Sequence, residues 1–319
     1  MTDALGREIN YLRLSITDRC NLRCRYCMPH DVPAVGHSDI LRYEEITRLC
    51  RIAASLGICN IKVTGGEPLV RKGCASLVGE LKKIPGIAHV TLTTNGVLLS
   101  EQLNDLLAAG IDAVNISLDT LHPAHYAEIT GFNCLDKVLA GMEQAVAAGI
   151  RVKINCVPLA TTPEDELLQV LQLAEKWPVD VRLIEMMPIG SGKNTAGYPM
   201  PQLEQLLHRT WDLTPSEQKR GFGPAQYYTA PNLRGSIGLI AAVSHGFCGQ
   251  CNRVRLTSEG YLKLCLSSDA GLDLRALLRG GATDEEIRTA ILDAILRKPA
   301  HHHFAARMPE TRPMWQIGG

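Results

Sequence analysis

Residues 12–29 read LRLSITDRCNLRCRYCMP, and this stretch decides how the rest of the chain is interpreted. Its first half alternates apolar and polar residues, which is typical of a β-strand. Its second half holds Cys20, Cys24 and Cys27 in the spacing C-x3-C-x2-C, with Tyr26 beside the last cysteine. Three thiolates can hold a four-iron cluster and leave one iron without a protein ligand, so that this iron is open to a small molecule.

Strand-like and helix-like patterns alternate through the first part of the chain. The strand patterns cover residues 12–17, 60–64, 89–94, 113–118, 151–157 and 179–186. The helical patterns cover residues 43–56, 74–83, 100–109, a stretch that ends near 148, and 163–176. This alternation predicts a parallel sheet with right-handed crossovers. Because a complete (β/α)8 barrel needs eight such units in roughly 250 residues, we predict an α/β fold with a partial, open (β/α)6 TIM-like barrel.

The character of the sequence changes at Pro188, where PIGSGKN reads as a turn-rich linker. We therefore divide the chain into a barrel core, residues 1–187, and a C-terminal region, residues 188–319. The C-terminal region is predicted to hold a strand at 235–243, a hairpin at 252–266, and helices at 272–279 and 284–297. We expect this smaller α+β region to close the gap in the barrel, and the three histidines at 301–303 to lie in a solvated loop.

Charge and composition exclude several classes of protein. Thirty-three basic residues balance 33 acidic ones, which argues against a broad nucleic-acid-binding surface. No apolar run approaches the roughly 20 residues that span a bilayer, and no apolar stretch follows a basic start, so we expect a cytoplasmic protein without membrane contact. The odd number of cysteines, 11, argues against a disulfide framework. Those outside the two close groups are expected to be small buried apolar residues: Cys50, Cys59, Cys74, Cys134 and Cys156.

Polar and glycine-rich segments follow the predicted strands. They are the cysteine loop, TGGEP at 64–68, TTNG at 93–96, SLD at 117–119, Asn155 and EMM at 185–187. The carboxyl ends of parallel barrel strands meet at one rim, where barrel active sites are built. The sequence therefore predicts one functional site at this rim, with the cysteine loop as part of it.

A second group of cysteines occurs late in the chain, as Cys248-x2-Cys251-x13-Cys265. One interpretation is a zinc knuckle with His245 as the fourth ligand. The other is a second iron–sulfur cluster with one open iron. Arg253 and Arg255 alternate on the strand after Cys251 and therefore share a face. A zinc knuckle does not require these arginines, whereas a polyphosphate would use them.

The C-x3-C-x2-C loop and its companion motifs resemble the radical S-adenosylmethionine (SAM) superfamily. The resemblance implies that Cys20, Cys24 and Cys27 ligate a [4Fe–4S] cluster whose free iron takes the amino and carboxylate groups of SAM. It also implies SAM contacts at Tyr26, Gly66, Ser117 and Met187. Gly65 and Gly66 have no Cβ, which would allow the backbone to approach the amino group of SAM.

Both cysteine groups together resemble one branch of that superfamily, the GTP 3′,8-cyclase family of molybdenum cofactor biosynthesis. The blocks that match are the segment from Leu12, VTGGEPLVR, TTNG, FCGQCNRVRLTSEGYLKLCL and the final Gly318-Gly319. The resemblance implies a second [4Fe–4S] cluster on Cys248, Cys251 and Cys265, whose open iron binds the guanine. It implies GTP contacts at Arg13, Lys62, Thr93, Lys153, Arg253, Val254 and Arg255, with Arg182 as a further candidate. It also implies that Gly318 and Gly319 assist SAM cleavage.

In the resembled family a 5′-deoxyadenosyl radical removes the ribose 3′-hydrogen of GTP. The product is (8S)-3′,8-cyclo-7,8-dihydroguanosine 5′-triphosphate. The resemblance also implies an external one-electron donor, a downstream cyclic pyranopterin monophosphate synthase that receives the product, and a monomer or homodimer. Two other interpretations stay open: a radical SAM enzyme that modifies a peptide, and a zinc-stabilised binding module without enzymatic activity.

Overall fold

One curved sheet of 12 strands organises the molecule, in the order β12-β11-β10-β1-β2-β3-β4-β5-β6-β9-β8-β7. The structure is a computed structural model that describes residues 1–29, 32, 35–218, 220–302, 304 and 312–318. The strands are β1 (Tyr11–Ser15), β2 (Asn60–Thr64), β3 (His89–Thr94), β4 (Ala113–Ser117), β5 (Arg151–Cys156), β6 (Asp180–Ile184), β7 (Thr214–Pro215), β8 (Gln226–Thr229), β9 (Ser236–Ile240), β10 (Arg253–Leu256), β11 (Tyr261–Lys263) and β12 (Gly271–Asp273).

The six predicted core strands are confirmed as β1 to β6, and each pairs in parallel with the next. The C-terminal region extends this parallel set at both ends, because β9 pairs in parallel with β6 and β10 pairs in parallel with β1. Antiparallel strands then continue from β9 and from β10. The strand order runs from one edge to the other without closing, so the open-barrel prediction is confirmed.

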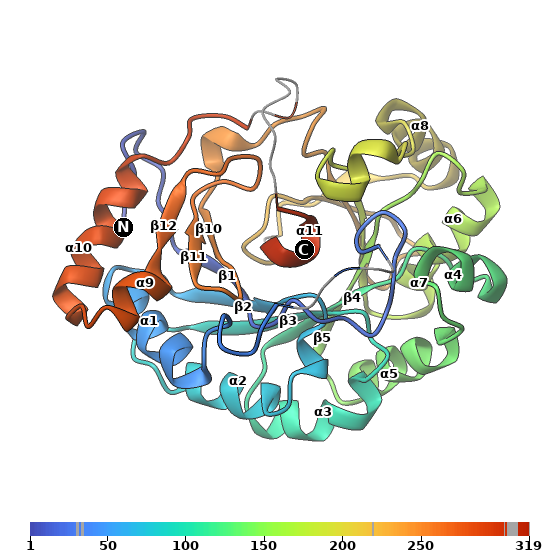
Figure 1. Ribbon diagram of the computed structural model, residues 1–319. Helices are drawn as coiled ribbons and strands as arrows, with labels where there is room; N and C mark the ends of the chain where they lie inside the picture. The colour runs from blue at the N-terminus through green and yellow to red at the C-terminus, as the bar shows by residue number, and fades with distance from the viewer. Residues whose placement is uncertain (30–31, 33–34, 219, 303, 305–311, 319) are drawn as a thin grey trace.

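Helices α1, α2, α3 and α5 cover the outer side of the curved sheet, whereas α11 lies inside the curve (Figure 1). The helices are α1 (Tyr43–Ser55), α2 (Cys74–Lys82), α3 (Leu99–Ala108), α4 (Pro123–Thr130), α5 (Leu135–Ala147), α6 (Glu164–Leu171), α7 (Leu173–Lys176), α8 (Met200–Thr210), α9 (Leu274–Arg279), α10 (Asp284–Leu296) and α11 (Met314–Ile317), with 3-10 turns η1 (Pro68–Val70), η2 (Gly190–Asn194) and η3 (Cys248–Gln250). The outer helices are amphipathic: α1 buries Ile46, Leu49 and Ala53 at helical spacing against the sheet.

The helix predictions differ from the structure in several places. The helix predicted at 163–176 is divided at Gln172 into α6 and α7. The helix predicted to end near 148 is two helices, because Gly131 adopts φ +79° and ends α4. The helix predicted at 272–279 begins at Leu274, since residues 271–273 pair with β11 as strand β12. Helix α8 was not predicted, although Leu203, Leu206 and Leu207 have the spacing of a buried helical face.

Searching the described helices for a long apolar stretch finds none able to cross a membrane.

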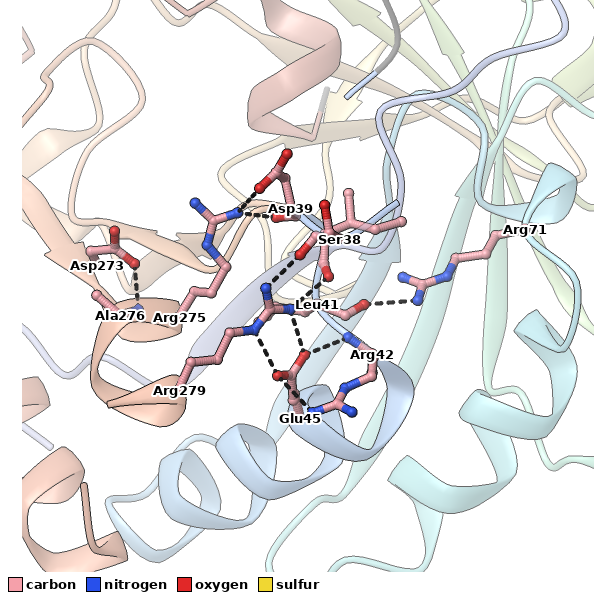
Figure 2. A network of polar contacts seen from close by, with 11 residues as sticks. Ser38, Asp39, Leu41, Arg42, Glu45, Arg71, Asp273, Arg275, Ala276 and Arg279 are labelled. Carbon is pink, nitrogen blue, oxygen red and sulfur yellow. Dashed lines mark hydrogen bonds and ion pairs between the residues drawn. The ribbon is translucent and has the colours of Figure 1, made fainter. Parts of the chain in front are cut away.

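Arginine side chains connect the C-terminal region to residues 38–45, which follow the cysteine loop (Figure 2). Arg279 on α9 makes a two-point contact with the carboxylate of Glu45 on α1, at 3.0 and 3.1 Å. The same guanidinium donates to the carbonyl oxygens of Ser38 and Ile40. From the other side, Arg71 donates to the carbonyl of Leu41 at 2.8 Å. The charged donors therefore hold an irregular segment that the sheet does not reach.

Replacing Arg279 with alanine should destabilise the fold by about 2 kcal/mol, because Glu45 is buried and loses a charged partner. Hydrogen bonds from Arg279, acting against burial, lower the pKa of Glu45 to about 2. Because the folded state favours the ionised form of Glu45, the contact with Arg279 stabilises the fold fully above pH ~4.5. This stabilisation is lost as pH falls towards about 2 and Glu45 becomes protonated. Urea unfolding of wild type and Arg279→Ala should therefore differ most at neutral pH and converge in acid.

Arg288→Ala is the matched control for this experiment, since Arg288 forms a half-exposed pair with Glu285 on α10. Such pairs contribute little, so we expect a change below about 0.5 kcal/mol. If Arg288→Ala lowered the free energy of unfolding as much as Arg279→Ala, the two-point contact of Arg279 would contribute no more than an exposed ion pair.

Candidate active site

One cavity of about 1030 Å³ lies inside the curve of the sheet. Its lining includes the cysteine loop, the glycine-rich segment after β2, the ends of β3 to β6 and the start of β10. The predicted rim is therefore assembled, because parallel strands bring all of their carboxyl ends to the same edge. The cavity also extends to the opposite end of the strands, where Tyr11 and His89 line it.

Cys20, Cys24 and Cys27 all line this cavity, in a loop between β1 and α1. Burial, with smaller contributions from the neighbouring Cys20 and Asp119, raises the pKa of Cys27 to about 12. Burial and the adjacent Cys27 also raise the pKa of Cys24 well above its usual value. Three buried thiolates close together would repel one another and would lack solvation, so ionisation of these cysteines is unfavourable on its own. Bound iron would compensate the negative charges and so favour the thiolate forms. The donor set therefore fits a thiolate-bound cluster with one iron left open.

The two glycines after β2 are required by the cysteine loop itself. A Cβ on Gly66 would lie 2.5 Å from the carbonyl oxygen of Arg19, and one on Gly65 would lie 2.6 Å from that of Thr17. The backbone nitrogens of Gly66 and Glu67 donate to Thr17 and Arg19 at 2.7 and 2.8 Å. Only glycine permits this approach, so the TGGEP segment fixes where the cysteine loop lies.

Glu67 is fully buried beneath this contact. Burial raises the pKa of Glu67 to about 7, although hydrogen bonds from Asn95 and Leu69 oppose the shift. One carboxylate oxygen accepts from the Thr94 hydroxyl at 2.8 Å, and the other accepts from the Asn95 backbone at 2.6 Å. The carboxylate thus ties the end of β3 to the glycine-rich segment and holds two sides of the rim together.

The residues predicted to contact SAM lie along the same rim. Tyr26, Gly66, Ser117 and Met187 all line the cavity. The hydroxyl of Tyr26 donates to Asp119 at 2.7 Å, and Asp119 also accepts from the backbone of Val157. Asp119 was present in the SLD motif without a role, and the structure shows that it orients Tyr26.

A group of cationic side chains occupies the middle of the cavity. Arg13, Lys62, Lys153, Arg182, Arg253 and Arg255 all line it. The register places Arg13 beside Lys62 on one side and beside Arg255 on the other. Thr93 lines the same space, and its hydroxyl is buried without a hydrogen-bond partner among the described residues. Val254 differs, because its side chain is buried in the core on the opposite face of β10.

The electrostatics of this group favour an anionic ligand. Burial, followed by repulsion from Arg182 and Arg13, lowers the pKa of Lys62 well below its usual value. Burial and then Arg182 lower the pKa of Lys153 to about 7. The amide of Asn115 is placed to accept from Lys62 and Arg182, but it is neutral and leaves their charge uncompensated. Buried charges are stable only when paired, so a polyanion would relieve this repulsion.

The later cysteines lie beside the cationic group, at the start of β10. Arg255 faces Lys263 in the β10–β11 hairpin, and this register brings Cys265 close to Cys251. Burial opposes ionisation of Cys251, but the charges of Lys298 and Arg253 outweigh it and lower its pKa. The Lys298 ammonium also donates to the Arg253 carbonyl at 2.8 Å. These charges favour the thiolate of Cys251, which therefore fits a role as a ligand of a second metal-bound group.

The surroundings of Cys248 differ from the sequence expectation. The backbone nitrogen of His302 lies 3.3 Å from the Cys248 sulfur, and the His302 ring packs against Phe304. The prediction of a solvated loop is therefore wrong at His302, while His303 lies outside the described residues. Within the part of the chain that the structure covers, no three His, Cys, Asp or Glu side chains are placed to hold one metal ion.

The C-terminal tail enters the cavity from inside the curve. The carbonyl oxygen of Gly318 accepts from Arg255 at 2.7 Å and from Arg13 at 3.5 Å. Gly318 adopts φ +80°, and a Cβ there would lie 3.0 Å from Ser15 and Thr64. Gly319, the other predicted catalytic residue, lies outside the described residues. Gly318 thus lies against the cationic group and beside the ends of β1 and β2, which lead into the cysteine loop and the glycine-rich segment.

Several lining residues were not found from the sequence. Arg220 comes from the segment between β7 and β8, Tyr227 comes from β8, and Trp315 comes from α11. A basic residue within the glycine-rich RGFGP was a signal for Arg220, but nothing in the sequence linked it to the barrel.

Family comparisons agree with the geometry. Residues 14–174 match the Radical SAM superfamily, and residues 179–304 match Molybdenum Cofactor Synthesis C. The SuiB enzyme of Streptococcus suis, in its crystal structure bound to S-adenosylmethionine, has the same fold with a TM-score of 0.66 and 16% identity over 89% of this chain and 68% of that chain. These matches assign SAM and iron–sulfur chemistry to the protein at the level of the superfamily.

Similar curated proteins identify the family within the radical SAM superfamily to which the chain belongs. The GTP 3′,8-cyclase of Heliobacterium modesticaldum is 45% identical, that of Clostridium perfringens strain SM101 is 43% identical and that of Moorella thermoacetica is 45% identical, each over 100% of both chains. The chain therefore belongs to the GTP 3′,8-cyclase family of radical SAM enzymes, which confirms the resemblance given by its motifs.

Gly66→Ala should displace the cysteine loop, because its Cβ would meet backbone atoms of Arg19 and Asp18 that cannot rotate away. We expect a loss of about 2 kcal/mol of stability and less iron bound per chain after anaerobic reconstitution. Gly79→Ala is the control. Gly79 lies in helix α2, and a Cβ there would lie 3.8 Å from Ala109, which is an ordinary contact distance. Normal iron binding by Gly66→Ala would contradict the role given to this glycine.

Proposed function

We propose that this protein converts GTP to (8S)-3′,8-cyclo-7,8-dihydroguanosine 5′-triphosphate, the first step of molybdenum cofactor biosynthesis. One observation carries the proposal: a single cavity joins a three-thiol loop to a group of buried cations, in which burial and cationic neighbours lower the pKa of Lys62 and of Lys153. A thiol site without the cations would suit many radical SAM substrates. The cations select a substrate that carries several negative charges, as a nucleoside triphosphate does.

We assign two [4Fe–4S] clusters, one on each cysteine group. Cys20, Cys24 and Cys27 would hold the first together with SAM, and Cys248, Cys251 and Cys265 would hold the second together with the guanine. When bound, SAM and the first cluster would supply the deoxyadenosyl radical that removes the ribose 3′-hydrogen. Closure of C3′ onto C8 would then need one further electron, from the external donor, and one proton to give the dihydroguanosine product. The volume of the cavity, about 1030 Å³, is at the upper end for ligand sites and supports two ligands side by side.

The protein's own residues bind, orient and enclose the substrates. Arg13, Lys62, Lys153 and Arg255 would neutralise the triphosphate, and Thr93 would donate its unpartnered hydroxyl. Lys62 offers charge without the planar fork of an arginine, so its contact would be less directional. Val254 would contribute through its backbone alone. Holding both substrates in one enclosed cavity supplies the proximity and water exclusion that a radical reaction needs.

The remaining assignments complete the proposal. Residues 1–187 would bind SAM and residues 188–319 would carry the second cluster, with GTP between them. An external one-electron donor would start each turnover, and a cyclic pyranopterin monophosphate synthase would receive the product. We propose a cytoplasmic monomer or homodimer.

Serine replacements should separate the two cysteine groups. Cys24→Ser should abolish formation of 5′-deoxyadenosine, because the cluster that holds SAM is lost. Cys265→Ser should keep about half of the iron and lose GTP turnover. Both are measured by iron and sulfide analysis and by product chromatography under anaerobic conditions. Wild-type cyclisation by Cys265→Ser, or zinc in place of iron at the later site, would exclude a substrate-binding cluster.

Removal of Gly318 and Gly319 should lower the rate of SAM cleavage with little effect on unfolding, because the tail contributes one carbonyl contact to Arg255 and Arg13. The readouts are 5′-deoxyadenosine formation and the thermal unfolding midpoint. An unchanged turnover rate would dismiss a role for the tail in the reaction.

A further inference from the structure

A segment from outside the barrel strands lines the far end of the cavity, away from the cysteine loop. Residues 220–224 lie between β7 and β8 and all five line the cavity. The Phe222 ring packs against His89 at a centroid distance of 4.7 Å and against Tyr11 at 6.3 Å. Tyr11 and His89 are the first residues of β1 and β3. One end of the segment is therefore fixed to the amino-terminal ends of these two strands.

The other end of the segment is fixed by an arginine. The Arg220 guanidinium pairs with Asp180 at 2.9 Å, and Asp180 is the first residue of β6. Gly221 follows with φ +144°, and a Cβ there would lie 2.9 Å from the Lys153 ammonium. Glycine thus lets the segment pass directly over the lysine. The segment spans from β6 to β1 and β3 across the amino-terminal mouth of the barrel.

Around Arg220, the cationic side chains carry more hydrogen-bond donors than the described neighbouring acceptors satisfy. Asp180 is the carboxylate there, and it is shared between Arg220, Lys153 at 3.8 Å and the Ser236 hydroxyl. The Nε atoms of Arg220 and Arg182 are buried and have no hydrogen-bond partner among the described residues. The Lys153 ammonium donates to the neutral hydroxyl of Tyr227 at 3.2 Å. Three cations with unused donors around one shared carboxylate form a site for one more anionic group.

We propose that Arg220 binds the terminal phosphate of the nucleotide and makes the site select a nucleoside triphosphate over a diphosphate. This inference rests on the proposed use of GTP. The later cysteines lie near β10, whereas Lys153 lies on β5 and Arg220 pairs with Asp180 on β6, several strands away in the curved sheet. A nucleotide anchored by its base at the cysteines would extend its phosphate chain across the cavity towards Arg220. The guanidinium then exchanges part of its contact with Asp180 for a phosphate oxygen.

The test compares binding of GTP and GDP to the anaerobically reconstituted enzyme by equilibrium dialysis. For Arg220→Gln we expect GTP affinity to fall on the order of tenfold, as one charged hydrogen-bonded contact is lost. GDP affinity should change by less than about twofold, so the preference for GTP collapses. At saturating GTP the turnover rate should stay within about twofold while KM rises. Arg288→Gln, on the outer face of α10, should change neither affinity.

Arg220→Lys keeps the charge without the fork and should fall between wild type and Arg220→Gln, and it carries the test if Arg220→Gln does not fold. Equal losses for GTP and GDP, or an unchanged ratio of the two affinities, overturn the inference. A wild-type enzyme that binds GTP without preferring it to GDP overturns it as well. A wild-type enzyme that does not bind GTP instead refutes the proposed function on which it rests.

Discussion

The pairing of β1 with strands from both ends of the chain is the constraint on which the site depends. On one side β1 pairs with β2, which leads into the glycine-rich segment, and on the other with β10, which follows Cys248 and Cys251. This register sets Arg13 between Lys62 and Arg255, and it sends the chain from Ser15 directly into the cysteine loop. A shift of β1 by one residue would turn Arg13 towards the core and separate it from Lys62 and Arg255.

The site stores unfavourable electrostatic energy in the absence of ligand. Burial and mutual repulsion depress the pKa of Lys62 and Arg255, and burial raises the pKa of the Cys24 and Cys27 thiols. The neutral amide of Asn115 and the carbonyl of Gly318 satisfy some of the donors without cancelling their charge. An apolar core and the arginine network around Glu45 offset this cost elsewhere, as is common where binding sites conflict with stability.

Local patterns predicted most of the fold and the composition of the site. The alternation of strands and helices identified β1 to β6, and the placement of motifs after strands identified the rim. Alternation along β10 placed Arg253 and Arg255 on one face, but the sequence also predicted Val254 as a GTP contact, and the structure shows its side chain in the core. Pairing of β10 with β1 and of β9 with β6 could not be read from the sequence, because contacts between distant segments leave no local periodicity. The sequence did not identify Arg220 as a site residue for the same reason, because its partner Asp180 lies on a distant element.

The interleaving of β9 and β10 with the first six strands has a consequence for how the chain is made. During synthesis, β1 and β6 each keep a bare side until residues 236–256 have left the ribosome. Exposed strand edges attract other chains, and pairings over such sequence distances form slowly. While the residues between β6 and β10 are being made, the nascent polypeptide therefore exposes both edges of an incomplete barrel, and we expect its yield to depend on translation speed and on chaperone supply.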